Sequence, residues 1–135
     1  MQKYKNKKDG KTRSHLETAI WKMLETEGIE FDYEKHVFTL IPSFNPAFTL
    51  EGKKGLKMNQ IKKTRPTTYT PDFVGSGWIL EAKGMRLPDF NIKWKLMQHQ
   101  YPNFDYYLPR NMKQAKLVID TINDRHQGLL QKQES

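Results

Sequence analysis

The 135-residue chain contains no cysteine and no long run of apolar residues. Without cysteine the protein can form neither disulfides nor thiolate metal sites, which fits a reducing compartment. No segment approaches the roughly 20 apolar residues of a membrane-spanning helix. The basic first residues are also not followed by the apolar run of a signal peptide. We therefore expect a cytoplasmic protein without membrane contact.

Apolar residues are scarce overall, at 36% of the sequence against 28% charged residues. The length suits one domain with one hydrophobic core, and we find no internal repeat. The low apolar content indicates either a small domain with a large polar surface or an obligate dimer. We expect a flexible basic arm at residues 1–13, a single domain at residues 14–125 and a tail at residues 126–135.

Acidic residues are fewer than basic ones, and the net charge of +8 is concentrated in two segments. Residues 1–14 and residues 45–66 each carry six basic residues and one acidic residue, so the remainder sums to −2. Such segments suit contact with a phosphate backbone, although lysine-rich loops and termini are often only solvated. The candidate DNA-binding residues are Lys5, Lys7, Lys8, Lys11, Arg13, Lys53, Lys54, Lys57, Lys62, Lys63 and Arg65.

Hydrophobic periodicity and turn residues predict three helices and several strands. The segment at residues 42–66, rich in lysine, glycine and asparagine, is predicted to be a loop or a small extra hairpin. The order indicates an α/β or α+β core with a mixed central sheet flanked by helices. The predicted elements are a helix from Ser14 to Gly28, a long strand at 29–40, a hairpin at 67–84, a helix from Pro88, a strand at 104–108 and a helix from Asn111.

The run TYTPDFVGSGWILEAKG at residues 68–84 carries the candidate active site. Alternate residues of a strand share a face, so Glu81 and Lys83 project together. A hairpin turning at residues 75–77 would bring Asp72 beside Glu81. Two carboxylates can hold a hard divalent cation, and a lysine can position the attacking water or stabilise charge on a phosphate.

An ordinary solvated Glu–Lys pair would give the same spacing as this candidate site. The residues at 78–80 (Trp-Ile-Leu) are apolar on both faces, which predicts a buried strand. Charged side chains directly after a buried strand are costly unless they pair or bind metal. The setting therefore favours a nuclease site over the solvated pair.

Glu17 has two interpretations from the residues alone. Ser14 and Glu17 fit the capping box, in which the Glu17 side chain would return to the Ser14 amide. Glu17 also lies at the rim of the predicted buried face, from which it could coordinate a cation or its water. We favour the cap on this pattern alone. The four histidines do not share metal-ligand spacing and are interpreted as structural or surface residues.

The chain resembles the bacteriophage endonuclease I family, which resolves four-way (Holliday) junctions with a restriction-endonuclease-like core of the PD-(D/E)xK superfamily. The resemblance lies in HLETAIWKMLETEGIEFDYE at 15–34, TYTPDF at 68–73 and ILEAKG at 79–84, and more weakly at 92–109. It implies a metal-dependent DNA endonuclease, with Mg²⁺ or Mn²⁺ as cofactor. Its setting would be phage DNA recombination or processing in the host cytoplasm.

The resemblance also assigns roles to individual residues. It implies that Asp72 and Glu81 are the main metal ligands and that Lys83 is the catalytic lysine. It turns Glu17 from a cap into an active-site carboxylate that can serve both roles. A further acidic position of the family falls at Asp32, for which Glu34 is a possible substitute.

Relatives of this kind act as homodimers that exchange strands, so the resemblance implies a dimeric partner and sites built from two chains. The chain departs from the family between Pro42 and Asp72, where its segment is considerably longer. That segment could extend the bridge between subunits, form a DNA-binding flap or end the exchange. Two other functions stay open: a nuclease for ordinary duplex or single-stranded DNA, and a basic, non-catalytic nucleic-acid-binding protein.

Overall fold

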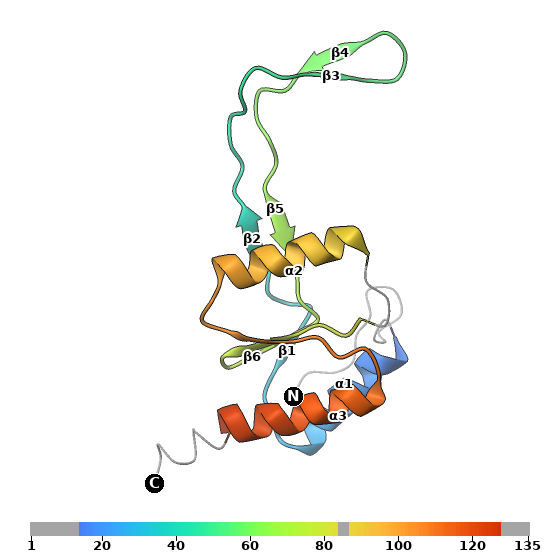
Figure 1. The fold of residues 1–135 in the computed structure, drawn as a ribbon, viewed down its shortest axis with the longest axis vertical. Coiled ribbons are helices and arrows are strands. Elements are labelled where there is room, and N and C mark those ends of the chain that lie inside the picture. Colours follow the sequence, from blue (N-terminus) through green and yellow to red (C-terminus); the bar gives the residue numbers. More distant parts are fainter. Residues whose placement is uncertain (1–13, 84–86, 128–135) are drawn as a thin grey trace.

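A four-stranded mixed sheet lies at the centre of the protein, whose computed structural model describes residues 14–83 and 87–127 (Figure 1). The strand order is β1-β6-β7-β8, with β6 antiparallel to both β1 and β7, and with β8 parallel to β7. The bounds are β1 (Asp32–Tyr33), β6 (Phe73–Gly75), β7 (Trp78–Leu80) and β8 (Asp105–Tyr107). The predicted mixed sheet of an α/β or α+β protein is confirmed.

Helices cover both faces of this sheet. Figure 1 shows α1 (His15–Thr26) and α3 (Met112–Ile122) on one face and α2 (Pro88–Gln100) on the other. Beyond Ile122 the chain continues as a π-helical turn, η1 (Asn123–Gln127). The predicted starts of α1 and α3 are confirmed, because the Ser14 and Asn111 side chains accept hydrogen bonds from backbone amides three residues later.

The hydrophobic core has one part on each face of the sheet. Phe73 and Leu80 pack with α1 and α3, whereas Val74 and Ile79 pack with α2. This alternation follows from the two-residue period of a strand. Because helices cover both faces, every side chain of β7 is buried, and the strand reads as a continuous apolar run.

The segment between β1 and β6 leaves the body as a two-stranded ribbon. Strand β2 (Phe38–Ile41) pairs antiparallel with β5 (Thr67–Tyr69) above α2. Farther out, the Thr64 amide donates to the Phe44 carbonyl at 2.8 Å, and β3 (Leu50–Gly52) pairs with β4 (Met58–Gln60). We call residues 42–66 the arm. Of the two predicted alternatives, the extra hairpin is the one observed.

The prediction of one long strand at residues 29–40 is wrong. Strand β1 ends at Tyr33, and Glu34 has a φ of 47°, in the left-handed region that non-glycine residues rarely adopt. This residue turns the chain out of the central sheet and toward the separate β2–β5 pair. The break also brings the Glu34 backbone beside Asp72, because the Glu34 amide donates to the Asp72 carbonyl.

Residues 1–13, predicted to be a flexible basic segment, lie outside the described residues, as does most of the predicted tail. The candidate DNA-binding residues in this N-terminal segment are Lys5, Lys7, Lys8, Lys11 and Arg13. Within the part of the chain that the structure describes, no helix is long and apolar enough to cross a membrane.

Candidate active site

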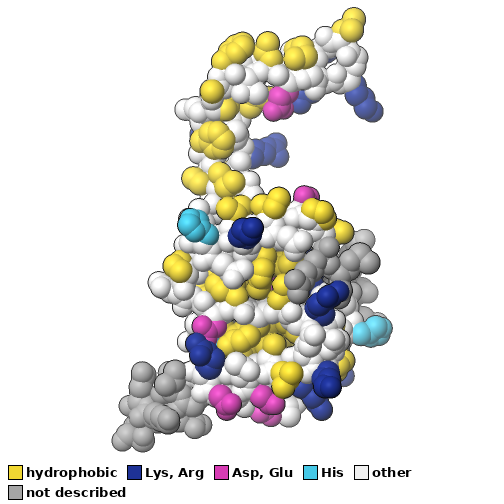
Figure 2. All heavy atoms as spheres, in the orientation of Figure 1, with side chains coloured by type: hydrophobic (Ala, Val, Ile, Leu, Met, Phe, Trp, Pro, Cys, Tyr) yellow, Lys and Arg dark blue, Asp and Glu magenta, His cyan; other side chains and the backbone are white. Residues whose placement is uncertain are grey.

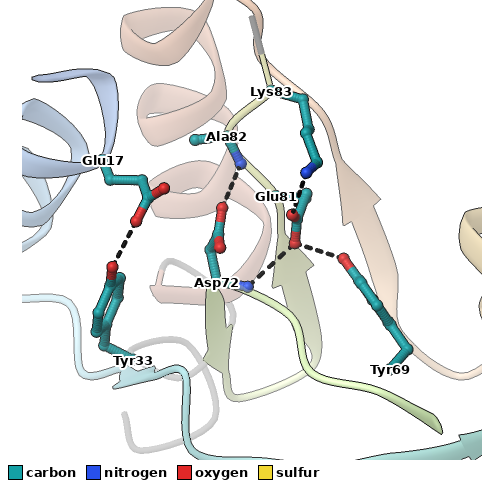
Figure 3. A network of polar contacts seen from close by, with 7 residues as sticks. All are labelled: Glu17, Tyr33, Tyr69, Asp72, Glu81, Ala82 and Lys83. Carbon is teal, nitrogen blue, oxygen red and sulfur yellow. Dashed lines mark hydrogen bonds and ion pairs between the residues drawn. The ribbon is translucent and has the colours of Figure 1, made fainter. Parts of the chain in front are cut away.

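The β6–β7 hairpin brings the two predicted carboxylates of Asp72 and Glu81 together. Phe73 pairs with Leu80, so Asp72 and Glu81 follow at the same end of the hairpin. The Asp72 amide donates to Glu81 Oε1 at 3.1 Å, and the Ala82 amide donates to Asp72 Oδ2 at 2.9 Å. Figure 3 shows these two bonds between the strands. Backbone amides therefore fix one oxygen of each carboxylate.

Lys83 lies beside Glu81 as the strand period predicts. Its Nζ is 3.8 Å from Glu81 Oε2, and it stands over the Phe90 ring at 5.0 Å from the centroid. The Lys83 side chain is 35% exposed, whereas that of Glu81 is 7% exposed. The ammonium group is thus at the open edge of the site, where it can meet a phosphate arriving from solvent.

Two further carboxylates lie near Asp72, from Glu17 on α1 and from Glu34 just after β1. One oxygen from each of Glu17, Glu34 and Asp72 lies within 4.8 Å of the others. In Figure 3 the Asp72 carboxylate is placed between those of Glu17 and Glu81. A group of carboxylate oxygens is the ligand set that hard cations such as Mg²⁺ prefer, so these three residues could hold a divalent cation.

The structure places Glu34 and Asp32 in different surroundings. The left-handed backbone at Glu34 is held by its amide, which donates to the Asp72 carbonyl at 2.9 Å. The Asp32 carboxylate instead lies 2.6 Å from His36 Nε2 and 3.7 Å from Lys35 Nζ. The hydrogen bond with His36 is the main cause that lowers the Asp32 pKa. Of the two acidic residues weighed for this position, Glu34 is the one in the carboxylate group.

At Glu17 the backbone amide takes part in the helix cap, and the side chain lies in the candidate site. Its amide donates to Ser14 Oγ at 3.1 Å, which is one half of the predicted capping box. Its carboxylate accepts a hydrogen bond from the Tyr33 hydroxyl. The whole Glu17 residue is only 5% exposed. The start of α1 therefore combines a helix cap, made by the Ser14 side chain, with a buried carboxylate in the candidate site.

Two tyrosines complete the site, and no sequence pattern pointed to them. Tyr33 donates to Glu17, and Tyr69 donates to Glu81 Oε1 at 2.5 Å (Figure 3). Burial raises the pKa of both tyrosines, so each hydroxyl keeps its proton and acts as a donor. Tyr69 stands inside the TYTPDF run, but no spacing rule marks a tyrosine as the partner of a distant carboxylate.

Burial and mutual repulsion make the carboxylates difficult to ionise. Asp72 is 7% exposed and Glu81 is 5% exposed. Burial, followed by the nearby charges of Glu81 and Glu17, raises the pKa of Asp72 well above its usual range. Burial also raises the pKa of Glu81, although the hydrogen bond from Tyr69 opposes the change. A bound dication would offset this repulsion, which is the electrostatic reason to expect one here.

The predicted DNA-binding residues of the middle segment lie apart from the carboxylates. All are exposed on the arm, which extends away from the body (Figures 1 and 2). They are Lys53, Lys54, Lys57, Lys62, Lys63 and Arg65. The arm therefore holds these six basic residues away from the buried carboxylates of the candidate site.

A mixed sheet flanked by helices, with buried carboxylates and a lysine where two strands end, is consistent with a nuclease-like fold. The sequence matches the family model for phage endonuclease I over residues 1–124, and the chain belongs to this family.

Two curated relatives are similar to this chain. Endonuclease I of Escherichia phage T7 is 32% identical over 113 residues, which is 82% of this chain and 62% of the relative. Endodeoxyribonuclease 1 of Enterobacteria phage T3 is 32% identical over 106 residues, which is 78% of this chain and 57% of the relative. The chain therefore spans about three fifths of the length of these relatives. No solved structure gives a significant match.

Proposed function

We propose that the protein is a divalent-metal-dependent DNA endonuclease that cuts four-way or otherwise branched DNA. The observation that carries this proposal is the position of Asp72, buried between the Glu17–Glu34 carboxylates and the Glu81–Lys83 pair. The printed names of the T7 and T3 relatives, both endonucleases, support the same reaction class.

Mg²⁺ or Mn²⁺ is the cofactor that suits these residues. Glu17, Glu34 and Asp72 would hold the cation, because one oxygen from each lies within 4.8 Å of the others. Glu81 lies beside Asp72, whose amide donates to Glu81 Oε1, and would act as a further ligand. When bound, the cation supplies Lewis-acid polarisation of the phosphate and neutralises charge that develops on its oxygens. The raised pKa of Asp72 supports this assignment, because burial and neighbouring carboxylates oppose its ionisation without a cation.

Lys83 is the residue that would contact the phosphate. Glu81 holds its ammonium group at 3.8 Å, at the open edge of the site. From this position Lys83 would donate to a phosphate oxygen or to the attacking water and stabilise the negative charge of the transition state. Tyr33 and Tyr69 hold Glu17 and Glu81 in fixed orientations, so the site needs little rearrangement during the reaction.

The exposed lysines of the arm would bind backbone phosphates. Contacts of this kind position DNA without reading its bases, which suits recognition by shape. The arm leaves the body beside α2 and extends away from it (Figure 1). It would therefore contact a different part of a branched DNA from the duplex that lies in the active site. Cleavage would take place in the host cytoplasm.

A homodimer would match the two-fold symmetry of a four-way junction and make paired cuts. In this chain α1 and the β6–β7 hairpin of one molecule together supply Glu17, Asp72 and Glu81. We propose a homodimer in which each chain completes its own site, without the exchange that the family resemblance implies. Exposed apolar side chains near the base of the arm, Val37, Ile41 and Phe44, suit contact with the second copy.

Mixing two inactive proteins separates complete sites from exchanged sites. Glu17→Gln and Lys83→Ala would be unfolded together, refolded as mixed dimers and assayed for junction cleavage. If each chain completes its own site, every site carries one defect and the mixture stays inactive. Recovery of activity would show that Glu17 and Lys83 of one site come from different chains.

The endonuclease proposal is tested with a four-way junction and a linear duplex of the same sequence. We expect the junction to be cut faster with Mg²⁺ or Mn²⁺, and no cutting with EDTA. Glu81→Gln and Lys83→Ala should bind the junction and fail to cut it. Equal rates on both DNAs would reject the junction preference, and a wild-type protein that binds but never cuts would reject the enzyme.

A further inference from the structure

The tip of the arm, residues Lys53–Lys57, presents a large apolar side chain entirely to solvent. Leu56 is 102% exposed. The turn is well defined, because the Lys53 amide donates to the Lys57 carbonyl at 2.9 Å and Gly55 adopts a φ of 85°, which glycine tolerates. Leu56 therefore contributes nothing to the packing of the described residues, although its position in the turn is fixed.

Leu56 continues an apolar side of the ribbon. Phe48, Leu50 and Met58 are 76%, 51% and 57% exposed. Leu50 and Met58 share one face, since Gly52 lies two residues after Leu50 and pairs with Met58. Figure 2 shows hydrophobic side chains gathered along the outer edge of the hairpin, with lysine or arginine side chains toward its inner edge. An apolar surface of this kind indicates a binding surface.

The charge of the segment favours DNA as the occupant over a second copy of the chain. Residues 45–66 carry six basic residues and one acidic residue. Two such hairpins would repel each other, whereas a polyanion would be attracted to both. Within a nucleic acid, the faces of the bases are the broadest apolar surface that Leu56 could contact. Bases at a branch point have an interrupted stack, so they are easier to reach than those of a continuous duplex.

We propose that Leu56 inserts against the bases at the branch point as an apolar wedge, while Lys53, Lys54 and Lys57 bind the phosphates on either side. Proteins that deform DNA use leucine and other apolar side chains in this way, between base steps whose stacking they interrupt. The inference rests on the proposed function, because it specifies how the same branched DNA is recognised. It assigns DNA recognition to the β3–β4 hairpin, which contributes no residue to the candidate active site.

The wedge is tested by the fluorescence of 2-aminopurine placed at the branch point of a four-way junction, with EDTA present to prevent cleavage. Binding of the wild-type protein should raise the fluorescence, because insertion unstacks the probe. Leu56→Ser should bind with the same salt dependence and abolish most of the rise, whereas Leu56→Phe should retain it. Leu117→Ser is the matched control, since Leu117 is 62% exposed on α3, and it should behave as the wild type.

Three other outcomes separate failure of the Leu56 wedge from failure of the proposed endonuclease function and from contact with a second copy. If wild-type protein binds and cuts the junction but Leu56→Ser gives the same fluorescence rise, the wedge is rejected and the endonuclease proposal stands. If wild-type protein neither binds nor cuts, the proposed function itself fails. If Leu56→Ser instead weakens self-association in sedimentation, the tip contacts a second copy and the DNA assignment is overturned.

Discussion

The body and the arm distribute charge and apolar surface in opposite ways. The body buries the carboxylates of Glu17, Asp72 and Glu81 together with its apolar side chains, so that Asp72 is 7% exposed and Phe73 beside it is fully buried. The arm exposes its basic residues and its large apolar residues alike, with Leu56 as the extreme case. The body thus contains a concentrated negative charge that favours a cation, and the arm contains a dispersed positive charge that favours a polyanion.

The two regions also differ in what holds their shape. Residues of the body are fixed by packing on both faces of a sheet. The outer part of the arm is fixed by backbone pairing between two strands, and both β3 and β4 are exposed along their whole length. Substitutions in the body should therefore change catalysis or stability, whereas substitutions in the arm should change DNA binding and leave the unfolding temperature unaltered.

The largest effect is expected at Lys83. Lys83→Ala should lower the rate of junction cleavage by about 10²–10³-fold at saturating protein, because a donor to developing negative charge is removed. Junction affinity should change little, since one charge of many is removed. Single-turnover cleavage and gel binding measure the two quantities. Lys113→Ala on the exposed side of α3 is the control. Loss of binding together with cleavage would make Lys83 a DNA anchor.

A smaller effect should separate the two acidic residues near β1. Glu34→Gln should raise the Mn²⁺ concentration needed for half-maximal cleavage by about 10–100-fold, the range typical of changes around a metal site. Asp32→Asn is the matched change and should leave this concentration unaltered, because Asp32 is paired with His36 and Lys35. The metal titration would place the ligand at Asp32 if the two variants behaved in the opposite way.

These two variants mark the limit of what could be predicted from the sequence. Helix starts at Ser14 and Asn111, and the pairing of β6 with β7, follow from local signals: capping side chains, glycine turns and alternation. The sequence indicates Glu34 only as a possible substitute for Asp32, because its left-handed backbone is imposed by contacts distant in sequence. Its amide bonds to Asp72, 38 residues later in the chain.

Local sequence patterns also do not predict the tyrosine partners of the carboxylates or the direction of the arm. The hydrogen bonds from Tyr33 to Glu17 and from Tyr69 to Glu81 depend on how α1 and the β2–β5 pair are placed against the central sheet. The lysine-rich composition of residues 42–66 marked the segment as an insertion. Its direction away from the body depends on the break at Glu34 and on the packing of Phe38 against Tyr101 at the end of α2.

The arm should contribute mainly through salt-dependent binding. Replacing Lys53, Lys54 and Lys57 with alanine should reduce the slope of log affinity against log salt by about 0.9 for each phosphate that the variant no longer neutralises. The expected decrease in affinity at moderate salt is about tenfold, with no change in the cleavage rate of bound DNA. Replacing Lys22, Lys113 and Lys116 removes the same charge from exposed sites on α1 and α3. Equal slopes for the two triple variants would show that the arm does not bind phosphates.

The smallest effect concerns the stability of the body without metal. Because burial and neighbouring carboxylates raise the pKa of Asp72, the folded protein binds more protons than the unfolded chain above the usual aspartate range. The contribution of this group to stability is therefore present at low pH and is lost as pH rises through the raised pKa. Asp72→Asn should remove that loss and raise the free energy of unfolding near neutral pH by about 0.5–2 kcal/mol, the usual range for stabilising changes.

Mg²⁺ should reverse the order of the two proteins. Added to the wild type, the cation should neutralise the repulsion and stabilise the folded state by mass action, whereas Asp72→Asn lacks one of the proposed ligands and should be stabilised less. Thermal unfolding with and without Mg²⁺, at two pH values, measures both effects. Asp120→Asn on the exposed side of α3 controls for the removal of one negative charge. If Asp72→Asn destabilised the metal-free protein, the hydrogen bond from Ala82 would outweigh the repulsion, and the carboxylates would need no cation to coexist.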